Sequence, residues 1–510
     1  MHHPGWLLGR AAACLWLLTT APAWSASFSF ANPPGPYAVG LRVVRQYDDS
    51  RSYRDGLDIV SGQVVDGPRA RPMQTLVWYP AASGGRPLHY ADYVALAATE
   101  ESLDPARQGP GALDRHADAL QALAHETMQA SLDRPPVDRK FPVVIYAPSF
   151  GASAMENADL CEYLASQGYV VIASASMGAR SRAMTGDLEG IETQVGDVEY
   201  LIAYAHSLAQ VDFDRIAVVG FSWGGLANVA AAARDFRIRA FVSLDGTVRY
   251  DNDMVKAIGY LSPARIEVPY LYVASRPATL EQMNVDKKYY DISKDFLNEL
   301  KYSDVYIATM NAMRHEDFSS YFLRVLPDDS DDAGYTRQEA SVAHAWVARY
   351  VERFLTAYLK HDAAARAFLG NAPERNGVPR HFMRVDARPR EAPAPTLENI
   401  AAELARHGFD QADALIREMR LDDADAKPAE GALDDWAHRA LYAGNAPRAV
   451  QLFQFALRLY PASAALYAGL GQAWQAGGNG AQAAASFRRA LALDPHNSVA
   501  TRELRALNEP

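Results

Sequence analysis

From residue 141 onward, short apolar runs alternate with segments that favour helices, and this alternation restricts the chain to few folds. Helical segments are predicted at 157–167, 197–208 and 226–234. Strands that alternate with helices form a mostly parallel sheet covered on both faces, with ligands bound beyond the carboxyl ends of the strands. We therefore predict an α/β domain over residues 26–370. Its predicted strands are 37–47, 74–79, 143–147, 169–175, 216–219, 241–244, 270–274 and 305–310.

One strand-to-helix turn carries a short motif with a serine at its centre. The apolar run 216–219 leads into the sequence GFSWGG at 220–225, and an Ala-rich segment that favours a helix follows. This is the G-x-S-x-G pattern of a nucleophile elbow in the strand, turn and helix context that the motif needs. Glycines flank such a serine because its backbone lies in a strained turn, where a nearby Cβ would clash. Ser222 is therefore the candidate nucleophile, and an ordinary strand-to-helix turn is the alternative.

A serine hydroxyl needs a histidine base, and the chain offers several histidines. In α/β-hydrolases the order along the chain is serine, acid, histidine. We favour His315, because it lies in a loop directly after the last predicted strand. His206 precedes the serine and lies in a predicted helix. His344 and His361 lie on the predicted closing helix, where core or surface roles are more typical.

The acid that would orient the histidine has two candidates. Asp245 ends the strand predicted at 241–244 and is followed by Gly246, which would place its carboxylate at the rim of the site. The rival position is the loop after the strand 270–274, which has no Asp next to the strand but contains Glu281. We favour Asp245, because a short carboxylate on a strand end is held more rigidly. Its ordinary alternative is to cap the following turn.

An oxyanion formed at the serine would need two backbone N–H donors. Trp223, the residue after the nucleophile, should supply one of them. The second should come from the loop at 148–151, and we favour Phe150, with Ser149 next. The two aromatic side chains would also provide apolar walls, although they could simply be packing.

Three stretches depart from the strand and helix rhythm. Residues 96–139 are rich in Ala, Gln and Leu, and we predict a helical insertion there that covers the site or serves as a structural flap. Residues 341–369 predict one long amphipathic helix that closes the domain. Residues 371–396 contain five prolines, a composition typical of a linker.

Beyond this linker, residues 397–510 are predicted to form an all-α module built on an internal repeat. The 34-residue period and the small residues where helices would touch resemble the tetratricopeptide repeat, a helix-turn-helix unit. A plain Ala-rich helical bundle is the alternative. Residues 396–420 are predicted as a degenerate earlier unit and 498–507 as a capping helix, and such repeats present a concave face to a protein partner. The matching pairs are Trp436 and Leu470, Gly444 and Gly478, Ala449 and Ala483, Phe453 and Phe487, Ala456 and Ala490, and Pro461 and Pro495.

The N-terminus has the pattern of an export signal. A modestly basic start precedes an apolar stretch at 11–18, and small residues follow at 19–26. We predict a signal peptide over residues 1–25, cleaved after Ala23 or Ser25, and therefore an exported chain, periplasmic or secreted. A membrane anchor is the alternative, but the apolar stretch is short for a bilayer span. We expect no integral membrane segment after cleavage.

Cysteines and charge exclude some further classes. Cys14 lies in the predicted signal and lacks the upstream Leu of a lipid-attachment site. Cleavage of the signal would leave Cys161 alone, so no intrachain disulfide could form. The formal net charge of −11 argues against a nucleic-acid partner. No clustered metal-ligand spacing occurs, and we expect neither a metal nor an organic cofactor.

Several short motifs together resemble the platelet-activating-factor acetylhydrolase and dienelactone-hydrolase-like branch of the α/β-hydrolases. In the acetylhydrolase branch the acid follows the strand after the elbow, which the resemblance places at Asp245. Dienelactone hydrolases proper use a cysteine, and this chain has Ser222. It also departs from the branch with Phe221 before the serine and with Pro148-Ser149 near the oxyanion loop. The motifs are YAVG at 37–40, VWYP at 77–80, GFSWGG at 220–225, LD at 244–245 and HEDF at 315–318.

The resemblance implies hydrolysis of small carboxylic esters. We therefore expect a serine esterase that works through an acyl-enzyme on Ser222, His315 and Asp245. A peptidase or amidase on the same residues is an alternative that the sequence does not separate from an esterase. An inactive scaffold that binds partners through its repeats is a third.

Overall fold

The computed structural model describes most of the chain. The described residues are 28–57, 60–64, 66–103, 116–263, 266–277, 295–327, 334–422 and 426–508. The predicted signal peptide at 1–25 and the alternative acid Glu281 lie outside them, as do residues 104–115 of the predicted insertion.

Among the described residues, ten strands form one mixed sheet in the order β10-β9-β8-β7-β6-β4-β5-β2-β1-β3. The pairs from β5 through β4, β6, β7 and β8 to β9 are parallel, as the alternation of strands and helices predicts. The pairs β1·β2, β2·β5 and β9·β10 are antiparallel. The strands are β1 (Ala38–Ser52), β2 (Ala70–Ala81), β3 (Ala130–Leu132), β4 (Phe141–Ala147), β5 (Val170–Ser174), β6 (Val211–Phe221), β7 (Ile238–Leu244), β8 (Tyr270–Ala274), β9 (Val305–Met310) and β10 (Met383–Arg388).

Two layers of helices cover the sheet. Successive side chains of β4 point to opposite faces: Val143 and Ile145 join a buried cluster with α4 and α5, whereas Val144 and Tyr146 join one with α3 and α12. Both faces of the central strands are therefore buried, which explains their continuous apolar sequence. The helices of this domain are α1 (Tyr90–Ala97), α2 (Ala117–Ala122), α3 (Ala158–Ser166), α4 (Leu188–Ala205), α5 (Trp223–Arg234), α6 (Asn252–Ala257), α9 (Phe296–Glu299), α10 (Ser320–Val325), α12 (Arg337–Leu359) and α13 (Ala363–Gly370).

Three sequence predictions differ from this arrangement. The predicted insertion at 96–139 is helical only in part among its described residues, because β3 pairs with β1 there. The predicted closing helix is two helices, since the chain turns at His361 (φ 54°) and Asp362 caps α13. The predicted linker at 371–396 contains β10, which pairs antiparallel with β9. Tertiary pairing decides the first and the third difference, and it leaves no signature in local composition. The second difference is a local turn and helix cap.

The helices of the C-terminal module repeat with the 34-residue period found in the sequence. α16 and α18 have bounds 34 residues apart, and so do α17 and α19. The turn between the paired helices repeats as well: Gly444 and Gly478 have φ of 77° and 78°, and Asn445 and Asn479 cap the next helix. The module consists of α14 (Leu397–His407), α15 (Ala412–Glu418), α16 (Glu430–Tyr442), α17 (Ala446–Leu459), α18 (Ala464–Ala476), α19 (Gly480–Leu493) and α20 (Ser498–Asn508).

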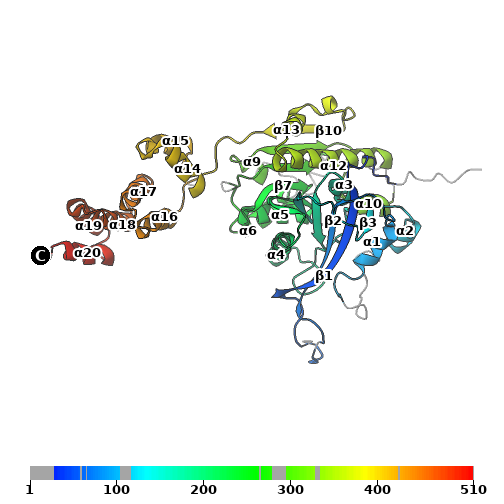
Figure 1. Ribbon diagram of the computed structural model, residues 1–510, viewed down its shortest axis with the longest axis horizontal. Helices are drawn as coiled ribbons and strands as arrows, with labels where there is room; N and C mark the ends of the chain where they lie inside the picture. The colour runs from blue at the N-terminus through cyan, green and yellow to red at the C-terminus, as the bar shows by residue number, and fades with distance from the viewer. Residues whose placement is uncertain are drawn as a thin grey trace, which may run out of the picture.

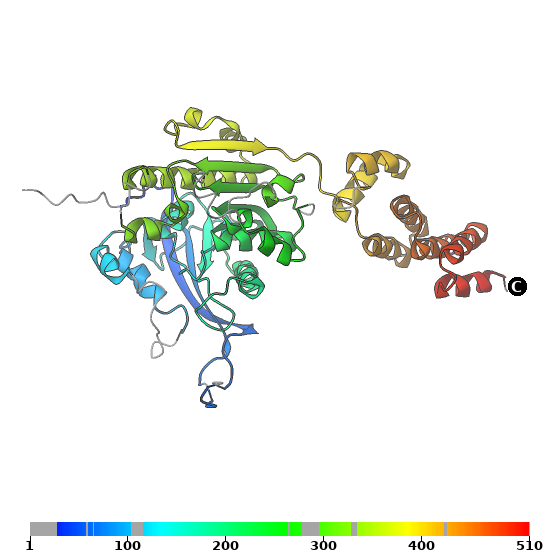
Figure 2. The ribbon, with the colours of Figure 1, turned by 180° about the vertical axis from the view of Figure 1, so that it is seen from behind.

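The module lies to one side of the sheet domain and is joined to it by the chain after β10 (Figures 1 and 2). α14 and α15 are nearest to the sheet domain, and α20 is at the far end. Within the described part of the chain, none of the helices has the length and apolar character to cross a membrane.

Candidate active site

The GFSWGG motif forms a sharp turn between β6 and α5. Ser222 lies between them with φ 54° and ψ −115°, a conformation that a non-glycine residue rarely adopts. Its flanking glycines are sterically required. A Cβ on Gly220 would lie 2.4 Å from the carbonyl oxygen of Gly224, and one on Gly224 would lie 2.1 Å from that of Ala147. The expected strained elbow is therefore present at the carboxyl end of β6.

The structure brings the three predicted polar residues together at the carboxyl edge of the sheet. His315 begins a short 3-10 helix (His315–Phe318) after β9, and Asp245 directly follows β7. His315 Nε2 lies 2.9 Å from Ser222 Oγ, and its Nδ1 lies 2.7 Å from Asp245 Oδ2. The three side chains thus form one continuous hydrogen-bonded chain.

Asp245 is buried, and its other carboxylate oxygen is also occupied. Oδ1 accepts hydrogen bonds from the Tyr250 hydroxyl (2.8 Å) and the Ser275 N–H (2.9 Å). Burial opposes ionisation of this group, but the hydrogen bond and charge of His315 outweigh it and hold the pKa of Asp245 below its usual value. Ser275 opens the loop after β8, so the described part of that loop supports Asp245 with a backbone amide.

His315 is partly exposed toward solvent, with 43% of its side chain accessible. Desolvation alone would lower its pKa, but the hydrogen bond and charge of Asp245 reverse this and raise the pKa above the usual value. The Phe221 ring packs against the imidazole, with centroids 4.9 Å apart, and stacks on Phe318. The residue before the serine therefore forms an apolar floor under the histidine.

The loop after β4 lies beside the elbow, as predicted for an oxyanion loop. Phe150 packs edge-on against Trp223, with ring centroids 5.6 Å apart, and is about half exposed. Ser149 N–H donates to the carboxylate of Glu156 (2.8 Å), so that amide is already used. Among the described residues, the Phe150 N–H has no hydrogen-bond acceptor. Gln194 supports the loop by donating to the Pro148 carbonyl (2.7 Å).

The other histidines considered lie elsewhere. His206 ends α4 and packs on Phe213. His344 is buried in α12 with Nδ1 bonded to the Asp317 carbonyl oxygen, and burial lowers its pKa. Among the described residues, the Ser222 hydroxyl has a hydrogen bond with His315 and with none of His206, His344 and His361.

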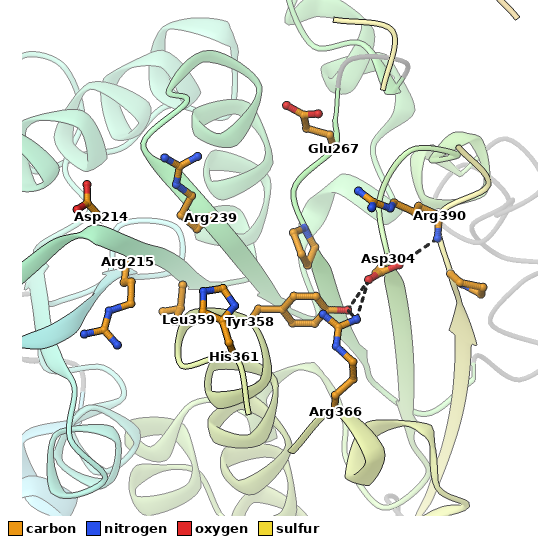
Figure 3. A pocket seen from close by; sticks show the side chains of 12 residues that line it. Asp214, Arg215, Arg239, Glu267, Asp304, Tyr358, Leu359, His361, Arg366 and Arg390 are labelled. Carbon is orange, nitrogen blue, oxygen red and sulfur yellow. Dashed lines mark hydrogen bonds and ion pairs between the residues drawn. The ribbon is translucent and has the colours of Figure 1, made fainter. Parts of the chain in front are cut away.

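His361 instead lines a hollow of about 670 Å³ at the opposite edge of the sheet (Figure 3). Its wall includes Arg239 near the start of β7 and Asp304 just before β9. Asp304 accepts hydrogen bonds from Tyr358 (2.8 Å) and Arg366 (3.1 Å). Ligands of parallel sheets bind at the carboxyl ends of the strands, so this hollow is not where chemistry at Ser222 would take place.

Four residues of the site escaped sequence reasoning. Tyr250 and Ser275 hold Asp245, Phe221 lies under His315, and Glu156 holds Ser149. Phe221 could have been inferred from its place in the motif. The other three carry no local signal, because each acts through a contact set by the fold.

This arrangement can carry out acyl transfer. A neutral imidazole within hydrogen-bond distance can take the serine proton, and a fixed carboxylate can stabilise the resulting imidazolium. Among the described residues, no group of three or more His, Cys, Asp or Glu side chains could hold a metal ion.

The chain is similar to several known proteins. The model of the X-Pro dipeptidyl-peptidase (S15 family) matches residues 126–373. Quorum-quenching protein AidA of Acinetobacter baumannii (strain MDR-ZJ06) is 30% identical over 116 residues, which cover 22% of this chain. The matched segment spans 38% of the length of that relative. A solved ferulic acid esterase from Streptomyces cinnamoneus has 19% sequence identity and a TM-score of 0.46, covering 66% of this chain and 94% of that one.

The segment that matches the peptidase family contains Ser222, Asp245 and His315. Together with the mostly parallel sheet and the elbow after β6, this match supports a relationship of the sheet domain to the α/β-hydrolase superfamily. The match and the geometry at Ser222 are both those of a hydrolase, and they leave the bond that is cleaved undetermined.

Proposed function

We propose that this chain is a serine hydrolase that cleaves small carboxylic esters through an acyl-enzyme. The observation that carries the proposal is the continuous hydrogen-bonded chain from Ser222 through His315 to buried Asp245. The motifs shared with the acetylhydrolase and dienelactone-hydrolase-like branch support an ester as the substrate. In the acetylhydrolase branch the catalytic acid follows the strand after the elbow, and Asp245 directly follows β7.

In this mechanism, Ser222 Oγ attacks the ester carbonyl carbon while its proton passes to His315 Nε2. The oxyanion accepts hydrogen bonds from the Trp223 and Phe150 N–H groups. The bond to the alcohol breaks as His315 returns its proton to the leaving oxygen. Water then attacks the acyl-enzyme and gives a proton to His315, which passes it to Ser222 as the acid leaves. Asp245 stays ionised throughout and stabilises each imidazolium.

The decisive test is Ser222→Ala assayed with p-nitrophenyl acetate. We expect kcat to fall by at least about 10⁴-fold, because no other group supplies the nucleophile. Ser207→Ala, at an exposed serine after α4, is the matched control and should retain full activity. A fluorophosphonate probe should label the wild-type chain at Ser222. Full activity of Ser222→Ala would contradict the mechanism, and absence of labelling at Ser222 would favour an inactive scaffold.

A peptidase is the second candidate, because the matching family model is that of an X-Pro dipeptidyl-peptidase. The proposed proton transfers are the same for an amide, with the amine leaving in place of the alcohol. A panel of p-nitrophenyl esters of graded acyl length and of X-Pro-p-nitroanilides separates the two. Faster turnover of the anilides would replace the esterase proposal with the peptidase one.

We further propose that the chain is exported and that its helical module binds a protein. Export is supported by the basic start, apolar stretch and small residues of the N-terminus. The 34-residue structural period supports tetratricopeptide-like repeats, whose stacked helices bind partners along a concave face. N-terminal sequencing of the protein recovered outside the cytoplasm should begin after Ala23 or Ser25.

A further inference from the structure

A buried glutamate lies directly behind the proposed oxyanion loop. Glu156 precedes α3 and is 3% exposed. Its Oε2 accepts hydrogen bonds from the Ser149 N–H (2.8 Å) and the Tyr146 hydroxyl (3.3 Å), and its Oε1 accepts one from the Ser149 hydroxyl. A single carboxylate therefore holds both hydrogen-bond donors of Ser149 and ties them to β4.

The same residue is also tied to the segment that carries the histidine. The Glu156 carbonyl oxygen accepts from the Tyr321 N–H (3.1 Å) and the Ser319 hydroxyl (3.3 Å). Both donors come shortly after the 3-10 helix that begins at His315. Glu156 thus connects the oxyanion loop with the base, two parts of the site that are far apart in sequence.

We propose that Glu156 is a positioning residue for the reaction at Ser222, an inference that rests on the proposed function. Its carboxylate takes up the Ser149 N–H and so leaves the Phe150 N–H for the oxyanion. Its negative charge also favours the protonated form of His315. No other carboxylate among the described residues accepts a hydrogen bond from this loop's Ser149.

The charges around Glu156 and His315 determine whether Glu156 raises or lowers the pKa of His315. Tyr146 donates a hydrogen bond to the Glu156 carboxylate, and Cys161 and His315 interact with it electrostatically. His315 also interacts with the charges of Asp245 and Glu316. Burial raises the pKa of Glu156 to about 7, although hydrogen bonds from Ser149 and Tyr146 oppose this. Glu156 is therefore mostly ionised above about pH 7. Its negative charge then raises the pKa of His315.

Glu162 provides a matched control within the same segment. It is also buried, and burial raises its pKa to about 7. Its carboxylate accepts from the Tyr93 hydroxyl (2.6 Å) and the Gln129 N–H (2.8 Å), and among the described residues it has no hydrogen bond to the oxyanion loop. Glu162→Gln thus removes an equivalent buried charge without touching the site.

The experiment compares the full-length wild type with Glu156→Gln, Glu156→Ala and Glu162→Gln on p-nitrophenyl acetate between about pH 5 and 9. Glutamine can accept from the Ser149 N–H and donate to its hydroxyl, so Glu156→Gln should retain kcat within about threefold. Its acidic limb of kcat/KM should move to lower pH by at least about half a unit, because the charge that favours protonated His315 is gone. Glu156→Ala should lower kcat by about tenfold or more, because the oxyanion donor is displaced.

Two results would overturn the inference. One is an acidic limb of Glu156→Gln that coincides with that of Glu162→Gln. The other is wild-type kcat in a folded Glu156→Ala. Thermal unfolding checks that each variant folds, and if Glu156→Ala does not, the pH comparison of the two glutamine variants decides. A wild-type chain that neither hydrolyses the ester nor takes up the fluorophosphonate probe would contradict the proposed function itself.

Discussion

At the scale of single residues, the site depends on how its carboxylate and imidazole are held. Asp245 has φ 41°, an uncommon conformation outside glycine, and uses both carboxylate oxygens in hydrogen bonds. Such conformations persist where the surrounding structure holds them in place. His315 consequently has one orientation, with one ring nitrogen facing the acid and the other facing Ser222.

The first prediction is the pH dependence of the reaction. His315 must be neutral to accept the serine proton, so kcat/KM should rise with pH as the imidazole loses its proton. Because Asp245 raises the pKa of His315, the midpoint of this limb should lie above the ordinary histidine value. A pH profile with p-nitrophenyl acetate measures it, and a midpoint below that value would contradict this view of the site.

The second prediction separates the acid from its supports. Asp245→Asn should lower kcat by about 10⁴-fold, because the wrong histidine tautomer is favoured. Tyr250→Phe removes one of three hydrogen bonds to Asp245 and should lower kcat by about tenfold at most. Steady-state kinetics with p-nitrophenyl acetate measures both losses of kcat, and circular dichroism checks that both variants are folded. Equal losses in the two variants would show that Tyr250 does more than hold Asp245.

At the scale of elements, the outermost strand β10 shows how tertiary pairing modifies a structure predicted from local composition. β10 lies in a Pro- and Arg-rich stretch, yet all six of its residues pair with β9. Met383 is buried at this edge. β10 thereby covers the edge of the strand that leads to His315, and an uncovered edge strand is prone to intermolecular pairing.

The third prediction concerns this edge. A shortened chain that ends at residue 370 should unfold several degrees below one that ends at Pro395, because it loses the β9·β10 pairing. Thermal unfolding followed by circular dichroism compares the two. Both chains lack the helical module, so its loss cannot explain a difference. Equal midpoints would mean that β10 adds nothing to the stability of the sheet.

At the scale of the whole molecule, the sheet domain and the helical module have separate cores. The module's main buried cluster contains residues of α14 to α18 and none from the sheet. Contacts at the junction include a hydrogen bond from Asn399 to Glu267 (2.8 Å) and a small apolar cluster of Tyr302, Ala394 and Ala426. The proposed catalytic residues lie at the carboxyl ends of the strands, whereas Glu267 precedes β8 at the opposite edge.

The fourth prediction follows from this separation. A chain that ends at Pro395 should hydrolyse p-nitrophenyl acetate with kcat/KM within about twofold of the full chain, because the module shares no core with the site. Steady-state kinetics measures this, and thermal unfolding confirms that the shortened chain is folded. Loss of turnover in a folded chain would show that the helical module shapes the site.

The sequence by itself determined the parts that rest on local periodicity and motif chemistry. Apolar runs and Ala-rich segments predicted the strands and helices of the parallel core, and the glycines at 220 and 224 predicted the elbow. The 34-residue spacing predicted the paired helices of the module. In each case the signal lies in the type and spacing of residues along the chain, so no tertiary contact is needed to interpret it.

Only the tertiary structure decided which distant residues meet. His315 and Asp245 are 70 positions apart, and chain order predicted them only as candidates; the fold brings Nδ1 of one within 2.7 Å of Oδ2 of the other. The fold also decided that Ser149 gives its N–H to Glu156, that Ser275 supports Asp245 and that β10 covers the sheet edge. These contacts depend on where strands end in space relative to one another. That placement is set by packing across the whole sheet and not by the residues on either side of each group.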